Sequence, residues 1–229
     1  MELTIRTVAT VPLTSRHRAG PPVAWGSVST LVAVEKIALG CTRCPLAESR
    51  TQVVFGEGDP EAGLMVVGEG PGREEDRQGR PFVGRSRQLL DKLLLEEAGL
   101  ARPQVYIANV VKCRPPNNRD PFPDEIAACR PYLDQQVTLI QPAVVLTLGN
   151  FASRTLLATA EGITRLRGRS YPFPGTPTTV VVPTFHPAAA LRGGGEVVAR
   201  MRADFVRARQ ILDAAGPRRA GPLTRAGDQ

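Results

Sequence analysis

The sequence predicts an α/β fold with three layers, in which a central, four-stranded, mainly parallel sheet carries helices on both faces. Short apolar runs rich in valine and leucine alternate with longer segments whose leucines recur at helical spacing. Most of the apolar runs lead into turns that contain glycine, proline or polar residues. Strand and helix repeated in this way build a parallel sheet that is covered on both sides.

Strands and helices are expected to follow one another along the chain. The four apolar runs expected to form strands are residues 64–68, 105–111, 142–148 and 178–184. The expected helices are residues 86–98, 123–140, a segment that follows Gly149-Asn150, and residues 196–212. Gly99 ends the first of these helices, and Pro123 with Asp124 favours the start of the second.

The chain of 229 residues is expected to form one domain, residues 31–212, between two poorly ordered tails, residues 1–30 and 213–229. The net charge is +7, and the tails carry +2 and +1 of it, so about +4 remains on the domain. That charge is only a weak indication of a polyanionic partner. No apolar run reaches the roughly 18 residues that span a membrane, so we expect no membrane partner. We also expect the protein to be cytoplasmic and monomeric.

Four cysteines, Cys41-x2-Cys44, Cys113 and Cys129, form a pattern typical of a metal site. The first pair has the spacing that presents two sulfurs to one centre. The second pair does not repeat it, which favours an iron–sulfur cluster over zinc. Two disulfides or buried apolar thiols are the alternatives, but the N-terminus lacks the pattern of a secretory signal, so a reducing compartment is expected.

Three segments follow predicted strands, where the site of a parallel α/β sheet is expected. They are Gly68-Glu69-Gly70-Pro71-Gly72, residues 109–113, and Phe185-His186-Pro187. The glycine-rich turn allows close backbone approach to a ligand, although a plain tight turn is the more common interpretation of such a motif taken alone. His186 is the one histidine of the predicted domain, and it is either a catalytic or a structural residue.

Four motifs together resemble the family-4 uracil-DNA glycosylases, which carry a 4Fe-4S cluster. The motifs are GEGPGREEDRQGRPFVG at 68–84, YIANVVKCRPPNNRDPFPDE at 106–125, FHPAAALR at 185–192, and the four cysteines. The resemblance covers about residues 35–212. It implies a uracil-DNA glycosylase-like fold and an enzyme of base-excision repair, which flips deoxyuridine out of DNA and hydrolyses its N-glycosidic bond, leaving an abasic site.

The resemblance also assigns roles in the pocket. Phe82 would stack on the extruded base, and the amide of Asn109 would pair with O4 and N3–H of uracil, a pattern that cytosine reverses. His186 would hydrogen-bond the anion that develops at uracil O2. The better-known uracil glycosylases have an aspartate where this chain has Gly70, a substrate-binding position of the turn.

The carboxylate that acts on water must therefore come from another position. We expect Glu69 to contact or orient the base and the water. Glu75 is expected to close the pocket where the methyl group of thymine would lie, and Asp76 is expected on a solvated face.

DNA contacts are expected from Leu191 as an apolar wedge and from Arg192, Arg114 and Arg119 as phosphate ligands. Packing against the final helix is the alternative role for Leu191. The partner is uracil-containing DNA, single- or double-stranded, so the protein would be nucleoid-associated during repair. Cys41, Cys44, Cys113 and Cys129 would hold a structural 4Fe-4S cluster.

Two rival functions remain open from the sequence. One is a relative that captures uracil covalently through an added histidine-bearing loop, but the segment KCRPPNNRDPFP at 112–123 has no histidine. The other is a non-enzymatic iron–sulfur protein that binds DNA, in which the motifs above are merely turns.

Overall fold

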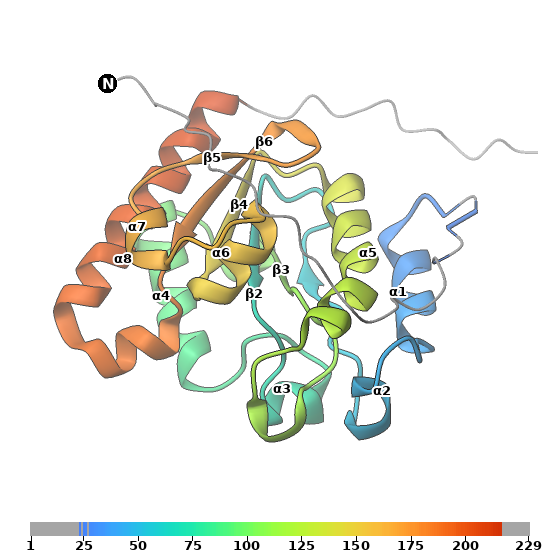
Figure 1. Cartoon of the computed structure of the whole chain (residues 1–229). Coiled ribbons are helices and arrows are strands. Elements are labelled where there is room, and N and C mark those ends of the chain that lie inside the picture. Colours follow the sequence, from blue (N-terminus) through green and yellow to red (C-terminus); the bar gives the residue numbers. More distant parts are fainter. Residues whose placement is uncertain (1–22, 24, 27, 217–229) are drawn as a thin grey trace, which may run out of the picture.

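The computed structural model describes residues 23, 25–26 and 28–216 and shows a three-layered α/β fold (Figure 1). Its sheet has six strands in the order β1-β3-β2-β4-β6-β5. The strands are β1 (Glu57–Gly58), β2 (Leu64–Gly68), β3 (Tyr106–Asn109), β4 (Val144–Leu148), β5 (Tyr171–Phe173) and β6 (Thr176–Thr184). The four inner strands are parallel, as predicted, and β1 and β5 add antiparallel edges that the sequence did not indicate.

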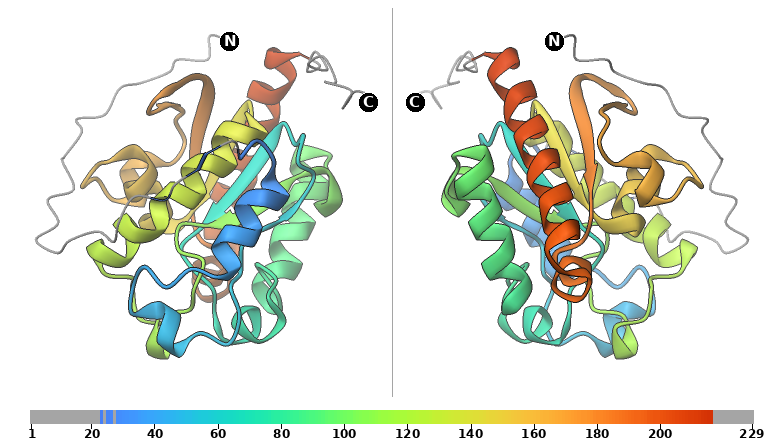
Figure 2. Two further views of the ribbon diagram at one scale, coloured as in Figure 1. Left: turned by 90° about the vertical axis from the view of Figure 1, so that its right-hand side faces the viewer. Right: turned by 90° about the vertical axis from the view of Figure 1, so that its left-hand side faces the viewer.

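Helices cover both faces of this sheet (Figure 2). They are α1 (Leu31–Leu39), α2 (Leu46–Ser49), α3 (Arg73–Gln78), α4 (Arg85–Ala98), α5 (Pro123–Ile140), α6 (Gly149–Leu157), α7 (Ile163–Leu166) and α8 (Pro187–Ala215), with 3₁₀ turns η1 (Arg102–Gln104) and η2 (Pro116–Asn118). Among the described residues, no helix is long and apolar enough to cross a membrane.

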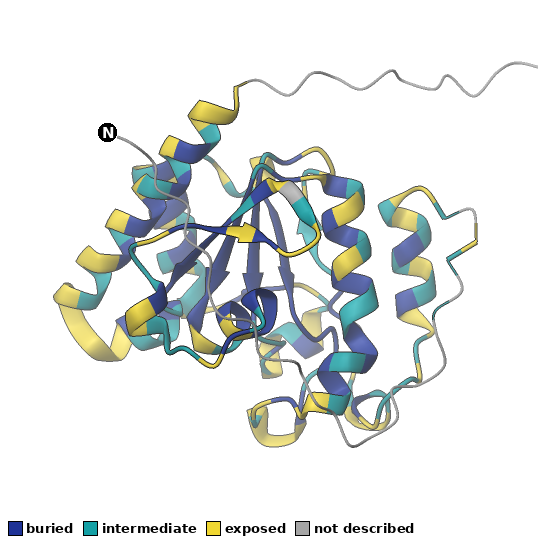
Figure 3. Ribbon diagram, turned by 45° about the horizontal axis from the view of Figure 1, so that its top comes forward, coloured by how far each residue is buried: buried dark blue, intermediate teal, exposed yellow. Residues whose placement is uncertain are grey.

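Alternate residues of each strand enter two separate cores. In β2, Met65 and Val67 pack with α1, α5 and α6, whereas Leu64 and Val66 pack with α4 and α8. Successive strand side chains point to opposite faces, so a strand that is covered on both sides is apolar throughout. Figure 3 shows the central strands as buried along their whole length.

Two segments differ from the sequence prediction in a way that matters for the site. The second inner strand, β3, ends at Asn109, so residues 110–113 leave the sheet and turn toward α5. The last helix begins at Pro187, well before residue 196, and is kinked at Gly194, whose φ is 72°. Both segments therefore lie at the carboxyl end of the sheet, and α8 ends at Ala215, inside the stretch expected to be a tail. Of the other predicted tail residues, 23, 25–26, 28–30 and 216 are described, and Val23, Trp25 and Val28 pack against the core. The rest lie outside the described residues.

Candidate active site

A pocket of about 550 Å³ opens at the carboxyl ends of the inner strands. This is the size typical of a small-molecule site. Its lining includes eight of the ten predicted site residues that are not cysteines: Glu69, Gly70, Glu75, Phe82, Asn109, Arg119, His186 and Arg192. Segments far apart in the sequence thus meet in one cavity, because parallel strands bring all their carboxyl ends to the same edge.

The floor of the pocket depends on glycines that allow close packing. A Cβ atom on Gly68 would lie 2.5 Å from both Asn109 Oδ1 and Phe82 Cζ. A Cβ on Gly70 would lie 2.7 Å from Val111 Cγ2, so this turn has little room for a larger side chain such as that of aspartate. The absence of side chains on these two glycines lets the phenyl ring and the amide approach the strand ends.

Asn109 is buried at the end of β3, with 2% of its surface exposed. Its Oδ1 has no hydrogen-bond partner among the described residues. A buried acceptor without a partner costs about 1–3 kcal/mol, which a ligand with a matching donor would recover. The amide is therefore prepared to receive a hydrogen bond from a bound molecule.

His186 caps the N-terminus of α8, and its Nδ1 accepts a hydrogen bond from the backbone N–H of Ala188 at 3.1 Å. Burial, and to a lesser degree the charge of Arg192, lowers the pKa of His186 to about 4. The imidazole is consequently neutral near pH 7, and because Nδ1 is an acceptor, the proton resides on Nε2. The ring lies 5.8 Å from the Phe82 ring, centroid to centroid, so its donor serves the same cavity.

Glu69 is the carboxyl group of the pocket whose ionisation the fold alters most clearly. Burial raises its pKa to about 7, and the neighbouring Asp120 carboxylate adds to this effect. A group with such a pKa can act as a base near neutral pH. Asp120 also lines the pocket, and the sequence analysis did not single it out although it lies within the quoted 106–125 motif.

Glu75 lines the pocket and also holds the loop that carries Phe82, because its Oε1 accepts a hydrogen bond from Val83 N at 2.9 Å. The expectation for its neighbour Asp76 was wrong. Asp76 is 3% exposed, and its Oδ1 accepts hydrogen bonds from the backbone N–H groups of Thr51 and Gln52 at 2.9 and 3.4 Å. Thr51 and Gln52 cover the side of α3 that carries Asp76, and this contact buries its carboxylate.

The four residues expected to touch DNA have different surroundings. Leu191 lies in the first turns of α8 and is 53% exposed, so more than half of it remains accessible, which favours the wedge over the packing role considered for it. Arg192 lines the pocket, whereas Arg114 lies outside its lining and donates to Asn118 Oδ1 at 2.7 Å.

Arg119 makes two hydrogen bonds to the buried Glu125 carboxylate, at 2.6 and 2.9 Å. Its guanidinium also lies 3.7 Å from the centre of the Phe122 ring. Both terminal nitrogens are thus already engaged, which the sequence pattern did not indicate. Arg119 is therefore the least available of the predicted phosphate ligands.

The four cysteines line one small cavity between α1, α2, the segment after β3, and α5, and all four are free thiols rather than disulfides. Apolar groups such as Ala38, Leu46 and Val111 form much of the remaining wall. Burial raises the pKa of the Cys113 thiol to about 11 and of the Cys129 thiol to about 12. Buried sulfurs of this kind become thiolates when a metal centre replaces their protons.

In the described part of the chain, no group of three or more histidine, cysteine, aspartate or glutamate side chains is arranged to hold a metal ion. Two N–H groups nevertheless point at the sulfurs: Lys112 N lies 3.2 Å from Cys129 Sγ, and Arg50 Nη1 lies 3.4 Å from Cys113 Sγ. Hydrogen bonds to sulfur are typical of iron–sulfur sites.

A buried lysine joins the cysteine cavity to the pocket. Lys112 is 2% exposed, and its Nζ donates to the backbone carbonyl of Asn109 at 2.8 Å and to Gln136 Oε1 at 2.5 Å. Its own backbone N–H contacts Cys129. Sequence reasoning missed this role, because nothing in the pattern distinguishes a buried lysine from a solvated one.

Comparison with known proteins agrees with this geometry. A family model described as the uracil DNA glycosylase superfamily matches residues 55–212. The type-4 uracil-DNA glycosylase of Sulfurisphaera tokodaii is 46% identical over 169 residues, which cover 72% of this chain and 77% of that protein. This chain belongs to the type-4 uracil-DNA glycosylases. The type-4 enzyme of Thermotoga maritima is 48% identical over 162 residues, covering 70% of this chain and 83% of that protein.

A more distant relative is the type-5 uracil-DNA glycosylase of Thermus thermophilus, 35% identical over 141 residues that cover 53% of this chain and 64% of that protein. The superfamily match includes every pocket residue named above. It contains Cys113 and Cys129 but begins after Cys41 and Cys44.

Proposed function

We propose that this chain removes uracil from DNA by hydrolysing the N-glycosidic bond of an extruded deoxyuridine. The observation that carries the proposal is the buried Asn109 Oδ1, which has no partner among the described residues and lines one pocket together with an aromatic ring and a neutral histidine donor. Family membership and the names of the relatives support the same activity.

Base recognition follows from hydrogen-bonding complementarity. The amide of Asn109 accepts from uracil N3–H and donates to O4, while Phe82 stacks on the ring and Gly70 leaves backbone room beside it. Cytosine has an acceptor at N3 and a donor at N4, so it would leave Asn109 groups unpaired in a dry site. Glu75 narrows the pocket where the C5 methyl group of thymine would lie.

Cleavage builds positive charge on the sugar and negative charge on the departing uracil, and the pocket stabilises both charges. As the C1′–N1 bond breaks, its electron pair moves onto uracil, and His186 Nε2–H hydrogen-bonds the developing anion at O2. A water molecule adds its oxygen to C1′ of the oxocarbenium-like sugar. Ionised Glu69 orients this water and accepts its proton, which finally passes to the departing base, so the products are uracil and an abasic site.

Extrusion of the nucleotide costs a few kcal/mol and requires contacts with the DNA itself. Leu191, which is 53% exposed beside the pocket residue Arg192, is suited to fill the space that the nucleotide leaves in the stack. Arg192 and Arg114 are proposed to contact phosphates, with a smaller part for Arg119 because Glu125 occupies its guanidinium. The protein would act as a monomer on chromosomal DNA.

Cys41, Cys44, Cys113 and Cys129 are proposed to hold a 4Fe-4S cluster with a structural role. When bound, such a cluster supplies four metal–thiolate bonds that tie the N-terminal segment to the end of β3 and to α5. Anaerobic purification should give a brown protein with four iron atoms and four inorganic sulfides per chain. A colourless protein with stoichiometric zinc would contradict the cluster.

One assay separates the proposed activity from its rivals. An end-labelled oligonucleotide with a single uracil is incubated with the protein and then treated with alkali, which cuts the strand at abasic sites. Cleavage at uracil, and none in matched oligonucleotides with thymine or cytosine, is the expected result. Binding without an abasic product would favour a non-enzymatic protein, and a DNA adduct that resists denaturation would favour covalent capture.

A further inference from the structure

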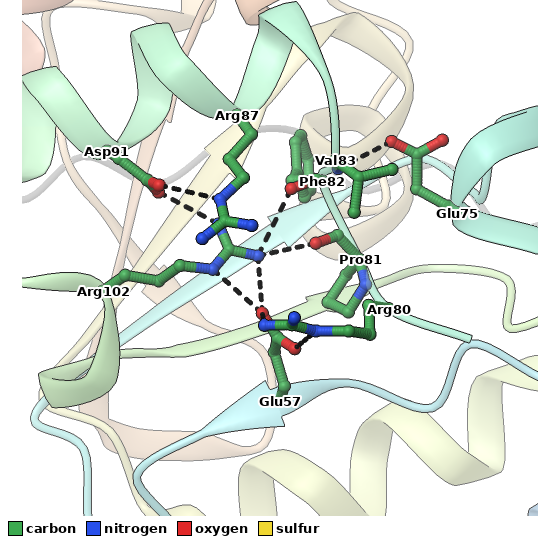
Figure 4. A network of polar contacts seen from close by, with 9 residues as sticks. All are labelled: Glu57, Glu75, Arg80, Pro81, Phe82, Val83, Arg87, Asp91 and Arg102. Atoms are coloured by element: carbon green, nitrogen blue, oxygen red, sulfur yellow. Dashed lines mark hydrogen bonds and ion pairs between the residues drawn. The ribbon is translucent and has the colours of Figure 1, made fainter. Parts of the chain in front are cut away.

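A network of charged side chains lies outside the pocket and behind the loop that carries Phe82 (Figure 4). At its centre is Arg102 of η1, whose side chain is 11% exposed. It donates to Glu57 Oε1 at 2.9 and 2.7 Å and to Asp91 Oδ1 of α4 at 3.0 Å. Two carboxylates from different elements therefore fix the orientation of one guanidinium.

The same guanidinium holds the loop. Arg102 Nη2 donates to the backbone carbonyl of Pro81 at 2.6 Å and lies 3.4 Å from that of Phe82. From the opposite side, Glu75 accepts a hydrogen bond from Val83 N. Residues 81–83 are thus bound at successive backbone groups by side chains from two different helical segments.

This loop requires such restraint, because Phe82 has a φ of +49°. A bulky residue in the left-handed region is an outlier that persists only when its surroundings determine it. The ring is nevertheless 6% exposed and lies against the position where Gly68 lacks a side chain. Besides the packing of the ring, Arg102 and Glu75 bind the backbone groups on either side of this residue.

We propose that Arg102, oriented by Glu57 and Asp91, is a positioning residue that holds Phe82 where it stacks on the extruded base. The proposal rests on the proposed function, and it adds a specific contributor that does not line the pocket. A lysine at this position would keep the charge but could not form the planar fork that reaches two carboxylates and two carbonyls together.

The test is a double-mutant cycle of Arg102→Lys and Phe82→Ala, measured as single-turnover excision from a uracil oligonucleotide. If Arg102 acts through Phe82, Arg102→Lys should lower the rate about tenfold in the natural background and less than about twofold when the phenyl ring is absent. Arg209→Lys is the matched control, because Arg209 also binds one carboxylate, Asp213, and one backbone carbonyl, Ala98, at the far end of α4. It should leave excision unchanged.

Equal losses in both backgrounds would overturn the inference and leave Arg102 as a general stabiliser of the fold. A second readout does not depend on catalysis: hydrogen exchange of the backbone amides of residues 80 and 82–84 should accelerate in Arg102→Lys and stay unchanged in Arg209→Lys. Unchanged exchange in both variants would likewise overturn it. Absence of excision by the natural protein would refute the proposed function instead, while the exchange comparison would still decide whether Arg102 holds the loop.

Discussion

Replacing Glu69 with glutamine should make the protein more stable and much less active at the same time. Burial keeps the pKa of Glu69 near 7, so its ionised form, which the proposed chemistry uses, is unfavourable in the folded state. Glutamine has nearly the same shape but carries no charge. The substitution therefore removes an electrostatic cost that the fold carries for the sake of the reaction.

The magnitude follows from the linkage between protonation and folding. The pKa of Glu69 rises from 4.5 to about 7, which would correspond to roughly 3 kcal/mol for a fully desolvated group. Because this carboxyl is only partly buried, solvent screening reduces the expected effect to about 1–2 kcal/mol. Since the folded pKa is raised, the natural protein loses this stability as pH rises from about 4.5 through 7.

Urea unfolding at pH 5, 6, 7 and 8 measures this directly. The advantage of Glu69→Gln over the natural protein should grow between pH 5 and 7 and level off above pH 7.5. Excision by the variant should fall by about 100-fold or more, within the range for losing a positioned base. Glu48→Gln, at an exposed position of α2, is the control and should show neither effect. An advantage over the natural protein that is no larger at pH 8 than at pH 5 would contradict this prediction.

Three further predictions concern the same pocket. The value of kcat/KM should rise with pH with a midpoint near 7, and this rise should disappear in Glu69→Gln. No step should appear between pH 5 and 6.5, because the pKa of His186 is about 4. A step in that range would contradict the neutral histidine. Asn109→Ala should lower kcat/KM for uracil by about 100-fold without lowering the melting temperature, since Oδ1 has no partner among the described residues of the free protein. Leu191→Ala should slow excision from duplex DNA about tenfold and from single strands much less, and equal losses would contradict a wedge.

Much of the fold was predictable because apolar runs and helical spacing mark buried strands and amphipathic helices. Helix α5 begins and ends where the pattern indicated, at Pro123 and Ile140. The edge strands β1 and β5 have only two and three residues, too few for any periodicity. The start of α8 was missed because Gly193-Gly194-Gly195 interrupts the helical pattern, and in the structure the chain kinks there and continues.

The candidate site was predictable to the extent that its residues follow the strands. Glu69, Asn109 and His186 meet because parallel strands share a carboxyl edge. What escaped prediction are contacts between segments distant in sequence, such as Arg102 with Pro81 and Lys112 with the backbone of Asn109. A sequence pattern records neither burial nor partner for an arginine or lysine, so these supporting residues resemble solvated ones.

The most direct test of hydrolytic uracil removal is a count of turnovers. The protein is mixed with a tenfold excess of single-uracil oligonucleotide, and released uracil and abasic sites are both quantified over time. Hydrolytic removal should give equal amounts of the two products, rising well beyond one per protein molecule, with no stable protein–DNA adduct. Release that stops at one equivalent, or uracil sites that remain intact while DNA is bound, would contradict it.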